Sequence, residues 1–242
     1  MTRPLYRDDA YLREAAATVA ALTEAGGVVL DASLFYPTGG GQPGDRGWLR
    51  WDGGEMPVAA TEKGMGPDIV LMPPEGAVLP TVGAKVTQAI DWDLRHRHMR
   101  VHTALHLLSV VLPFPVTGGA IGPDKGRLDF AMEDPLEDKD AVEAALNALI
   151  ARDLPVMADW ITDDELAANP GLVKTMSVAP PSGAGRVRLI RIGEGSDQID
   201  LQPCGGTHVA RTGEIGRMRI GKLEKKGRLN RRVNIHLDDY VF

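Results

Sequence analysis

The stretch that decides the fold runs from residue 91 to residue 111 and reads Asp91-Trp92-Asp93-Leu94-Arg95-His96-Arg97-His98-Met99-Arg100-Val101-His102-Thr103-Ala104-Leu105-His106-Leu107-Leu108-Ser109-Val110-Val111. Asp91 and Asp93 are residue types that cap helix N-termini, and the prolines that follow the stretch end a helix. The stretch therefore predicts a helix from about Leu94 to Val111. It also marks a change of pattern, because the residues before it favour strands.

Five short β-like runs precede the helix, and Gly-rich and Pro-rich turns separate them. They are Gly27–Leu34, Gly47–Trp51, Pro57–Lys63, Asp68–Met72 and Lys85–Ile90. This spacing predicts a small β-barrel over residues 1–90. The alanine-rich segment Tyr11–Thr23 departs from it, because its propensity favours a helix.

Helices and strands alternate after the long helix. A strand is predicted at Arg127–Ala131, an amphipathic helix from Leu136 to Arg152, and a third helix at the capping box Thr162-Asp163-Asp164-Glu165. Further β-like runs are 187–192, 198–202, 218–224 and 232–237, and the last two form a predicted hairpin around Lys226-Gly227. The prediction is an α+β fold, with a small N-terminal β-barrel at 1–90 and an α+β metal-binding domain at 91–242.

Composition excludes several classes of protein. The 242 residues are 43% hydrophobic and 25% charged, which is typical of a globular chain. No apolar run approaches the roughly 20 residues that a membrane-spanning helix needs, and the first residues lack a secretory pattern. The single cysteine, Cys204, excludes a disulfide framework. We therefore expect a cytoplasmic protein without a membrane partner. A monomer or weak dimer is our working expectation, because the sequence itself does not report the oligomeric state.

Two histidine-containing pairs carry the chemistry. His102 and His106 lie four residues apart, so they share one face of the predicted helix. Cys204 and His208 are also four residues apart, in Cys204-Gly205-Gly206-Thr207-His208. Three imidazoles and one thiolate suit a tetrahedral zinc site, although ordinary packing of these side chains is the alternative. We interpret the nearby His96 and His98 as part of a basic, exposed first turn and a half.

The basic residues are unevenly distributed in a chain of net charge −6. The segment Arg217–Arg232 holds eight basic residues against one acidic residue, whereas acidic residues concentrate between Glu133 and Glu165. The basic residues are Arg217, Arg219, Lys222, Lys225, Lys226, Arg228, Arg231 and Arg232. This edge suits a localised polyanion, and a solvated hairpin is the alternative interpretation.

Three separated motifs together resemble one family. His102-Thr103-Ala104-Leu105-His106-Leu107-Leu108 and Cys204-Gly205-Gly206-Thr207-His208-Val209 resemble the editing domain of alanyl-tRNA synthetase and the free-standing alanyl-tRNA editing (AlaX-type) hydrolases. The glycine-rich run from Leu34 to Gly47 resembles the loop of the family's N-terminal barrel, and 212–216 with 227–232 are similar to its closing segment. The resemblance covers roughly Phe35 to Arg232.

The resemblance implies an activity and a cofactor. It implies one zinc ion held by His102, His106, Cys204 and His208, and hydrolysis in trans of tRNA(Ala) mischarged with serine or glycine. It also implies a strand at Ala15–Thr23, which we favour over the helix because β context overrides alanine propensity. The alternatives are a non-catalytic, zinc-containing RNA-binding module and an ester hydrolase for another aminoacyl-tRNA.

The remaining site residues are hypotheses with ordinary structural alternatives. Thr117 is our candidate contact to the amino acid, or else a turn residue. Asp129 would hold the residues of the site in place through its carboxylate without contacting the substrate, or else pair with Arg127 or have an ordinary role in its strand. Gly40, Gly41 and Gln42 would bring backbone amides to the substrate, or else form a barrel turn. The basic segment, with Arg95, Arg97 and Arg100, would contact the acceptor end of tRNA(Ala). The zinc could be catalytic, substrate-orienting or structural.

Overall fold

The computed structural model describes residues 1–134, 138–174 and 185–239. These residues combine many strands with three α-helices, so the mixed α and β composition is confirmed. The chain divides into two compact units, Met1–His96 and Arg97–Phe242, and the division falls within helix α1 (Trp92–Val111). The predicted division into two domains, with a boundary near residue 90, stays a prediction.

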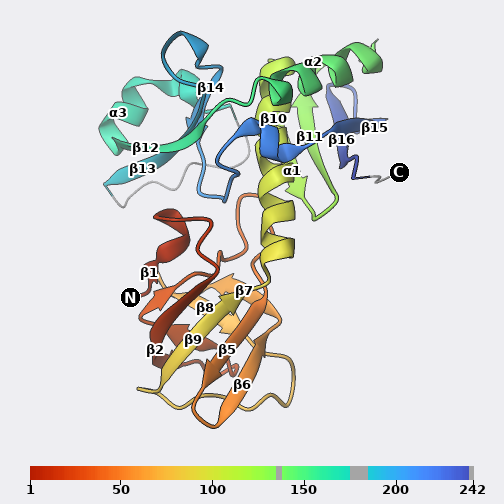
Figure 1. Ribbon diagram of the computed structural model, residues 1–242. Helices are drawn as coiled ribbons and strands as arrows, with labels where there is room; N and C mark the ends of the chain where they lie inside the picture. Colours follow the sequence, from red (N-terminus) through yellow and green to blue (C-terminus); the bar gives the residue numbers. More distant parts are fainter. Residues whose placement is uncertain (135–137, 175–184, 240–242) are drawn as a thin grey trace. The chain divides into compact units, whose positions relative to one another are not determined.

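The first unit is built on a seven-stranded antiparallel sheet with the strand order β6-β5-β9-β2-β3-β8-β7 (Figure 1). Its strands are β2 Glu14–Leu22, β3 Val28–Leu30, β5 Gly47–Trp51, β6 Gly54–Val58, β7 Ala60–Lys63, β8 Ile69–Met72 and β9 Lys85–Ile90. A short parallel pair, β1 Arg3–Pro4 and β4 Ala32–Ser33, lies beside it. The sheet surrounds one apolar core that includes Leu30, Phe35 and Leu49. The order ends at β6 and β7, so full closure into a barrel stays a prediction.

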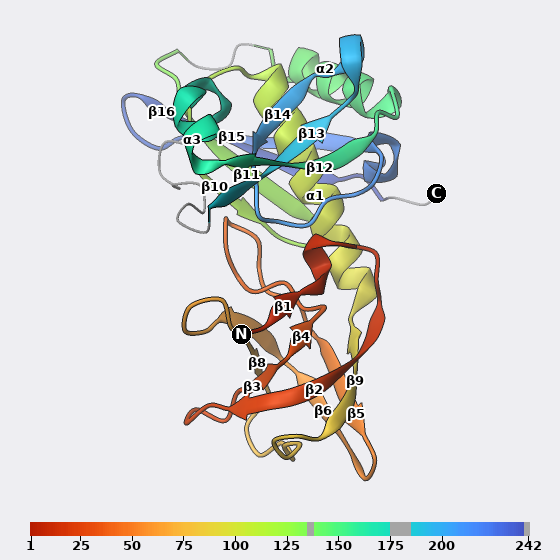
Figure 2. The same cartoon turned by 90° about the vertical axis from the view of Figure 1, so that its left-hand side faces the viewer.

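Strand β2 decides the conflict over the alanine-rich segment. Glu14–Leu22 is a strand and not a helix, so the prediction from propensity is wrong and the one from resemblance is confirmed. β2 pairs with β9 along Glu14–Thr18 and then with β3 from Val19 (Figure 2). Val19 is buried in the core between these partners. Tertiary pairing thus outweighs the helix preference of alanine.

Two predicted strands are each divided in the structure. The run Gly27–Leu34 becomes β3 and β4, separated at Asp31, whose carboxylate accepts from the Thr18 amide at 2.8 Å. The run Pro57–Lys63 is shared between β6 and β7. In both cases the local pattern indicated extended backbone correctly but did not show where pairing changes partner.

The second unit is organised around α1. A four-stranded antiparallel sheet has the order β10-β11-β16-β15, and a three-stranded one has the order β12-β13-β14. The bounds are β10 Val116–Ile121, β11 Lys125–Ala131, β12 Val156–Thr162, β13 Arg186–Ile192, β14 Asp200–Pro203, β15 Met218–Lys225 and β16 Asn230–Leu237. A side chain at Gly126 of β11 would meet Val101 and Leu105, so this glycine lets α1 approach the sheet closely. The predicted hairpin is confirmed as β15 and β16; β10 and β12 were not predicted.

The helix termini follow the predicted signals. The Asp91 carboxylate accepts from the Leu94 amide at 3.1 Å at the start of α1. α2 (Lys139–Ala151) is capped by Asp138, and the predicted start at Leu136 lies outside the described residues. α3 (Asp163–Ala168) has the predicted capping box of Thr162 and Glu165. Within the described residues, no helix combines the length and apolarity that a membrane span requires.

The first turns of α1 differ from the prediction of an exposed basic segment. Arg95 is fully buried, where it donates to Asp45 and to the Leu34 and Ala10 carbonyl groups. His98 is buried as well. The guanidinium of Arg95 is therefore a structural part of the first unit, and its proposed contact with RNA is wrong. Arginine is usually a surface residue, so the sequence alone suggested exposure. The buried carboxylate that pairs with it, Asp45, comes from a loop fifty residues earlier in the chain.

Candidate metal centre and basic sheet face

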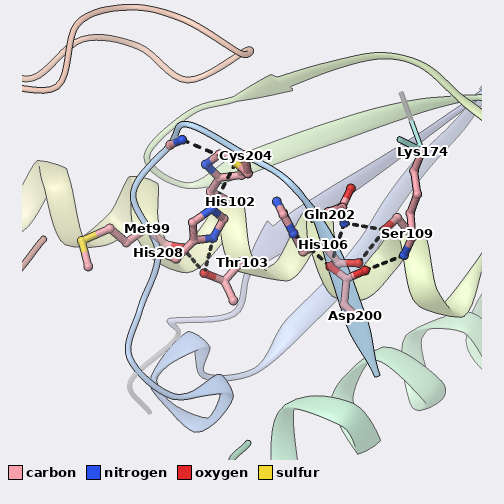
Figure 3. A network of polar contacts seen from close by, with 11 residues as sticks. Met99, His102, Thr103, His106, Ser109, Lys174, Asp200, Gln202, Cys204 and His208 are labelled. Atoms are coloured by element: carbon pink, nitrogen blue, oxygen red, sulfur yellow. Dashed lines mark hydrogen bonds and ion pairs between the residues drawn. The ribbon is translucent and has the colours of Figure 1, made fainter. Parts of the chain in front are cut away.

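Four side chains of the second unit converge on one point (Figure 3). His102 and His106 project from successive turns of α1, and Cys204 and His208 follow β14, with two glycines after the cysteine. One ligand atom from each of the four lies within 4.8 Å of all the others. Cys204 Sγ is 3.5 Å from His102 Nε2 and 3.3 Å from His208 Nε2. The structure thus brings together the four residues that the spacing singled out.

Thr103 fixes the orientation of His208. Its hydroxyl donates to the Met99 carbonyl at 2.9 Å, as a helical threonine often does. The hydroxyl has one proton, so its 3.1 Å contact with His208 Nδ1 requires that Nδ1 carry the hydrogen and donate. The Val209 amide donates to the same oxygen at 3.3 Å. His208 therefore presents the lone pair of Nε2 to the cluster.

The charge balance of the cluster suits a cation. Burial would raise the pKa of the Cys204 thiol, but the neighbouring His102 and His208 outweigh burial and hold it well below its usual value. Burial and the charge of His102 lower the pKa of His208 well below its usual value. Both residues are thus in the forms that bind metals, a thiolate and a neutral imidazole.

His106 has a charged partner. Burial would lower its pKa, but hydrogen bonds with Asp200 and Cys204 outweigh burial and raise it to about 9. The environment of His106 therefore favours a positive charge at this position, and a metal ion bound at Nε2 would supply that charge in place of the second ring proton. A thiolate and three imidazole nitrogens form the donor set that zinc prefers, whereas magnesium and calcium prefer oxygen ligands. The residues present fit a zinc ion.

Asp200 and Lys174 are two site residues that the sequence did not predict. The Asp200 carboxylate lies 3.0 Å from His106 Nδ1 and accepts from Lys174 Nζ at 2.5 Å. A signal was present, because alternate residues of a strand share one side and Asp200 lies four residues before Cys204. No comparable signal exists for Lys174, which is distant from every motif in the sequence.

Thr117 and Asp129 lie together on neighbouring strands. Thr117 is at a bulge of β10, and its hydroxyl donates to the Asp129 carbonyl at 3.1 Å and accepts from Asn230 Nδ2 at 3.0 Å. The Asp129 carboxylate pairs with Arg232 Nε at 2.7 Å and with Arg127 Nη1 at 2.7 Å. The alternative interpretation of Asp129, pairing with Arg127, is therefore what the structure has. The carboxylate that contacts His106 is Asp200.

The glycine-rich loop of the first unit is a tight turn. Gly39 and Gln42 exchange backbone hydrogen bonds of 3.0 and 2.9 Å. Gly40 and Gly41 have φ values of 57° and 81°, a left-handed backbone that favours glycine. The Gln42 side chain is buried. The alternative interpretation of this loop as a turn therefore describes its backbone, and its role toward a substrate stays a prediction.

The basic segment, Arg217–Arg232, forms β15, the turn after it and the first residues of β16. In register, Lys125, His236 and Arg219 form one row across three strands, and Asp129, Arg232 and Glu224 form another. Directly paired residues point to the same face of a sheet. His236 and Arg232 lie an even number of residues apart on β16, so both rows share one side of the sheet.

Several of the predicted cations have internal partners. Lys226 pairs with Glu224, both Arg217 and Arg219 pair with Asp238, and Arg232 pairs with Asp129. Arg231 donates to backbone carbonyl groups of the turn, while Lys222, Lys225 and Arg228 are exposed. Arg97 and Arg100 pair with Asp239. The ion pairs of Lys226, Arg217, Arg219 and Arg232 make the net positive charge of the hairpin region smaller than the residue count alone indicates.

Comparison with known proteins identifies the family. Residues 187–234 match the family described as threonyl and alanyl tRNA synthetase second additional domain, and residues 10–94 match class II (A) tRNA synthetases. The chain is 38% identical to the alanyl-tRNA editing protein AlaX-M of Methanosarcina mazei over 99% of this chain and 98% of that protein. It is 34% identical to the AlaX-M protein of Saccharolobus solfataricus over 96% of this chain and 98% of that protein.

A second group of relatives is longer. The alanine–tRNA ligase of Caldivirga maquilingensis is 37% identical over 93% of this chain, but the match covers only 25% of that enzyme. The full-length matches are therefore with the editing proteins and not with the ligases. The chain belongs to the alanyl-tRNA editing protein family, of the AlaX-M type.

Proposed function

We propose that this protein hydrolyses, in trans, the ester bond of tRNA(Ala) mischarged with serine, and with glycine as a second substrate. The observation that carries the proposal is the convergence of His102, His106, Cys204 and His208 in a chain related along its whole length to alanyl-tRNA editing proteins. A synthetase pocket shaped for alanine rejects serine and glycine poorly, so a separate hydrolytic site supplies the missing selectivity.

The four residues are proposed to hold one zinc ion. When bound, zinc supplies a positive charge that polarises an ester carbonyl or orients an amino group or a water molecule. The protein contributes the rigid frame: α1 sets the spacing of its two histidines, and Thr103 fixes the tautomer of His208. The two glycines let the chain turn back from Cys204 to His208 without a side chain in the way.

The choice of amino acid is assigned to Thr117 and its partner Asn230. The Thr117 hydroxyl proton is used on the Asp129 carbonyl, so toward a serine hydroxyl it would act as an acceptor. Asn230 donates to Thr117 through Nδ2, and its buried Oδ1 has no hydrogen-bond partner among the described residues. A serine hydroxyl would satisfy such an acceptor, whereas alanine would leave it unpaired. That difference is about 1–3 kcal/mol, or roughly 5- to 150-fold.

The RNA-binding role is assigned to the sheet face and the turn of the basic segment. Lys222, Lys225 and Arg228 are exposed cations of the hairpin. The row of Lys125, His236 and Arg219 lies on the sheet itself. Contacts of this kind with phosphates supply affinity and salt dependence rather than sequence choice. We further propose that the loop at 40–42, within the predicted barrel at 1–90, offers its backbone amides to the acceptor end of the tRNA.

A deacylation assay tests the activity. Purified protein should release serine from Ser-tRNA(Ala), and more slowly glycine, while Ala-tRNA(Ala) decays at its uncatalysed rate. His106→Ala should abolish release because it removes one ligand, and His96→Gln, a histidine on the first turns of the same helix, should retain activity. Equal uncatalysed decay of all three substrates by the zinc-loaded protein would refute the proposal.

A non-catalytic zinc-containing RNA-binding module is the second candidate. The observation that favours it is the complete set of four protein ligands, because closed tetrahedral sites are usually structural. This candidate predicts salt-dependent binding of tRNA without turnover. Activity on mischarged tRNAs other than tRNA(Ala) would instead indicate a hydrolase for another aminoacyl ester.

A further inference from the structure

A buried polar network lies directly behind His106 (Figure 3). The Asp200 side chain is fully shielded from solvent, and its Oδ2 lies 3.0 Å from His106 Nδ1 and accepts from Gln202 Nε2 at 2.7 Å. Its Oδ1 accepts from Lys174 Nζ at 2.5 Å. The carboxylate thus has donors on both oxygens, which is what makes its burial tolerable.

The network determines which nitrogen of His106 faces the cluster. An ionised carboxylate is only an acceptor, so the contact requires a hydrogen on Nδ1. The lone pair of Nε2 then points away from Asp200. The network also fixes the angle of the ring, because Asp200 itself is held from β14 and by Lys174.

His106 and His208 therefore have unlike partners. The Nδ1 of His208 meets the neutral hydroxyl of Thr103, whereas the Nδ1 of His106 meets a carboxylate. A carboxylate behind an imidazole increases its basicity and holds its orientation, and both effects strengthen metal binding. Asp200 adds a negative charge beside the cluster, and Lys174 balances part of it.

We propose that Asp200, held in place by Lys174 and Gln202, is the positioning residue of the metal centre, which orients His106 with Nε2 toward the metal ion. This inference rests on the proposed zinc site and adds to it the side chains that set its affinity. Lys174 has a second contact, because its backbone carbonyl accepts from the Val116 amide at the start of β10. The same residue thus connects the carboxylate behind His106 with the strand that carries Thr117.

Zinc affinity measured by competition with a chromophoric chelator tests the proposal. Asp200→Asn keeps the shape and one acceptor but removes the charge, so zinc should bind about 10- to 100-fold more weakly. The matched control is Asp159→Asn, a carboxylate of β12 that pairs with Arg191 within the same three-stranded sheet. The control should bind zinc as the unaltered protein does.

Two spectroscopic measurements separate positioning from general stability. The cobalt(II)-loaded Asp200→Asn protein should have a changed ligand-field absorption, and the cobalt(II)-loaded control should not. In the zinc-loaded unaltered protein, long-range ¹H–¹⁵N correlation spectra should show His106 protonated at Nδ1 and free of hydrogen at Nε2. The second measurement needs no variant, so it remains decisive if Asp200→Asn fails to fold.

The outcomes distinguish this inference from the function on which it rests. Failure of the unaltered protein to bind zinc would overturn the metal centre and the proposed function together. Zinc binding by the unaltered protein, together with equal affinity and an unchanged cobalt spectrum in Asp200→Asn, would overturn only the role of Asp200. A His106 ring protonated at Nε2 would do the same.

Discussion

Replacement of Asp129 by asparagine offers a quantitative test of the sheet face. The carboxylate of Asp129 is 13% exposed, and it accepts from Arg232 at 2.7 and 2.9 Å and from Arg127 at 2.7 Å. In Asp129→Asn, one oxygen still accepts a bond from Arg232, but the amide nitrogen cannot accept the other two. The variant therefore loses two hydrogen bonds between charged partners and leaves two arginines uncompensated.

The magnitude follows from these contacts. A hydrogen bond to a charged group contributes about 1.5–3 kcal/mol, and breaking a buried ion pair costs about 3–5 kcal/mol. Arg232 and Arg127 are 21% and 30% exposed, so water recovers part of the loss. We expect Asp129→Asn to lower the free energy of unfolding of the second unit by about 2–3 kcal/mol at pH 7.

The loss should depend on pH in one direction. Burial would raise the pKa of Asp129, but the ion pairs with Arg232 and Arg127 outweigh burial and lower it. Because the folded-state pKa is the lower one, the stabilisation is complete above the unfolded-state pKa of about 3.9 and disappears as the pH falls through the folded-state value. The difference between the two proteins should therefore shrink below about pH 4.

Hydrogen exchange of peptides that cover β11 and β16 measures this difference locally. Both proteins are compared at the same pH, so intrinsic exchange rates and any release of metal at low pH cancel. A difference of equal size at pH 7 and pH 3.5 would refute the electrostatic reasoning, and so would the absence of any difference at pH 7.

Three further predictions address other parts of the molecule. Arg95→Met should lower the stability of the first unit by about 3–5 kcal/mol in thermal unfolding, since it leaves the buried Asp45 carboxylate without its cation; an unchanged melting temperature would contradict the assignment of Arg95 to the core. Replacement of Lys225 and Arg228 by glutamine should weaken binding to any tRNA alike and reduce the slope of log affinity against log salt by about 1 per residue; an unchanged slope would remove them from the interface. Asn230→Ala should reduce the preference for Ser-tRNA(Ala) over Ala-tRNA(Ala) by roughly 5- to 150-fold in deacylation rates, and retained preference would place the serine contact elsewhere.

Local patterns predicted most of the elements, but they did not predict partners across the sheet. The cap at Asp91 and the capping box at Thr162 depend on residues close in sequence, so both helix starts were predictable. The segment Glu14–Leu22 depends on β9, about seventy residues away, and propensity alone gave the wrong answer. β10 has two glycines in its centre and lacks the usual strand composition, so only its pairing with β11 makes it a strand.

The metal ligands were predictable for the opposite reason. A histidine pair at helical spacing and a Cys-to-His pair around two glycines each place two ligands by local geometry, so only the meeting of the two pairs required the fold. The surrounding charges had no such local signature. Arg95 and Arg232 have the sequence character of RNA contacts, yet each has a carboxylate partner more than forty residues away.

The different partners of His106 and His208 explain why sequence spacing alone does not predict how strongly this site binds a metal ion. Spacing identifies which residues can reach one ion, but affinity depends on the hydrogen each imidazole donates on its far side. The hydrogen of His208 goes to Thr103 of α1, 105 residues away, and that of His106 goes to Asp200, ninety-four residues away. Lys174 also accepts a backbone hydrogen bond from the start of β10. A change at Asp200 should therefore affect both the binding of the metal ion and the position of the strand that carries Thr117. A search for further members with the same chemistry should therefore require Asp200 and Lys174 alongside the four ligands.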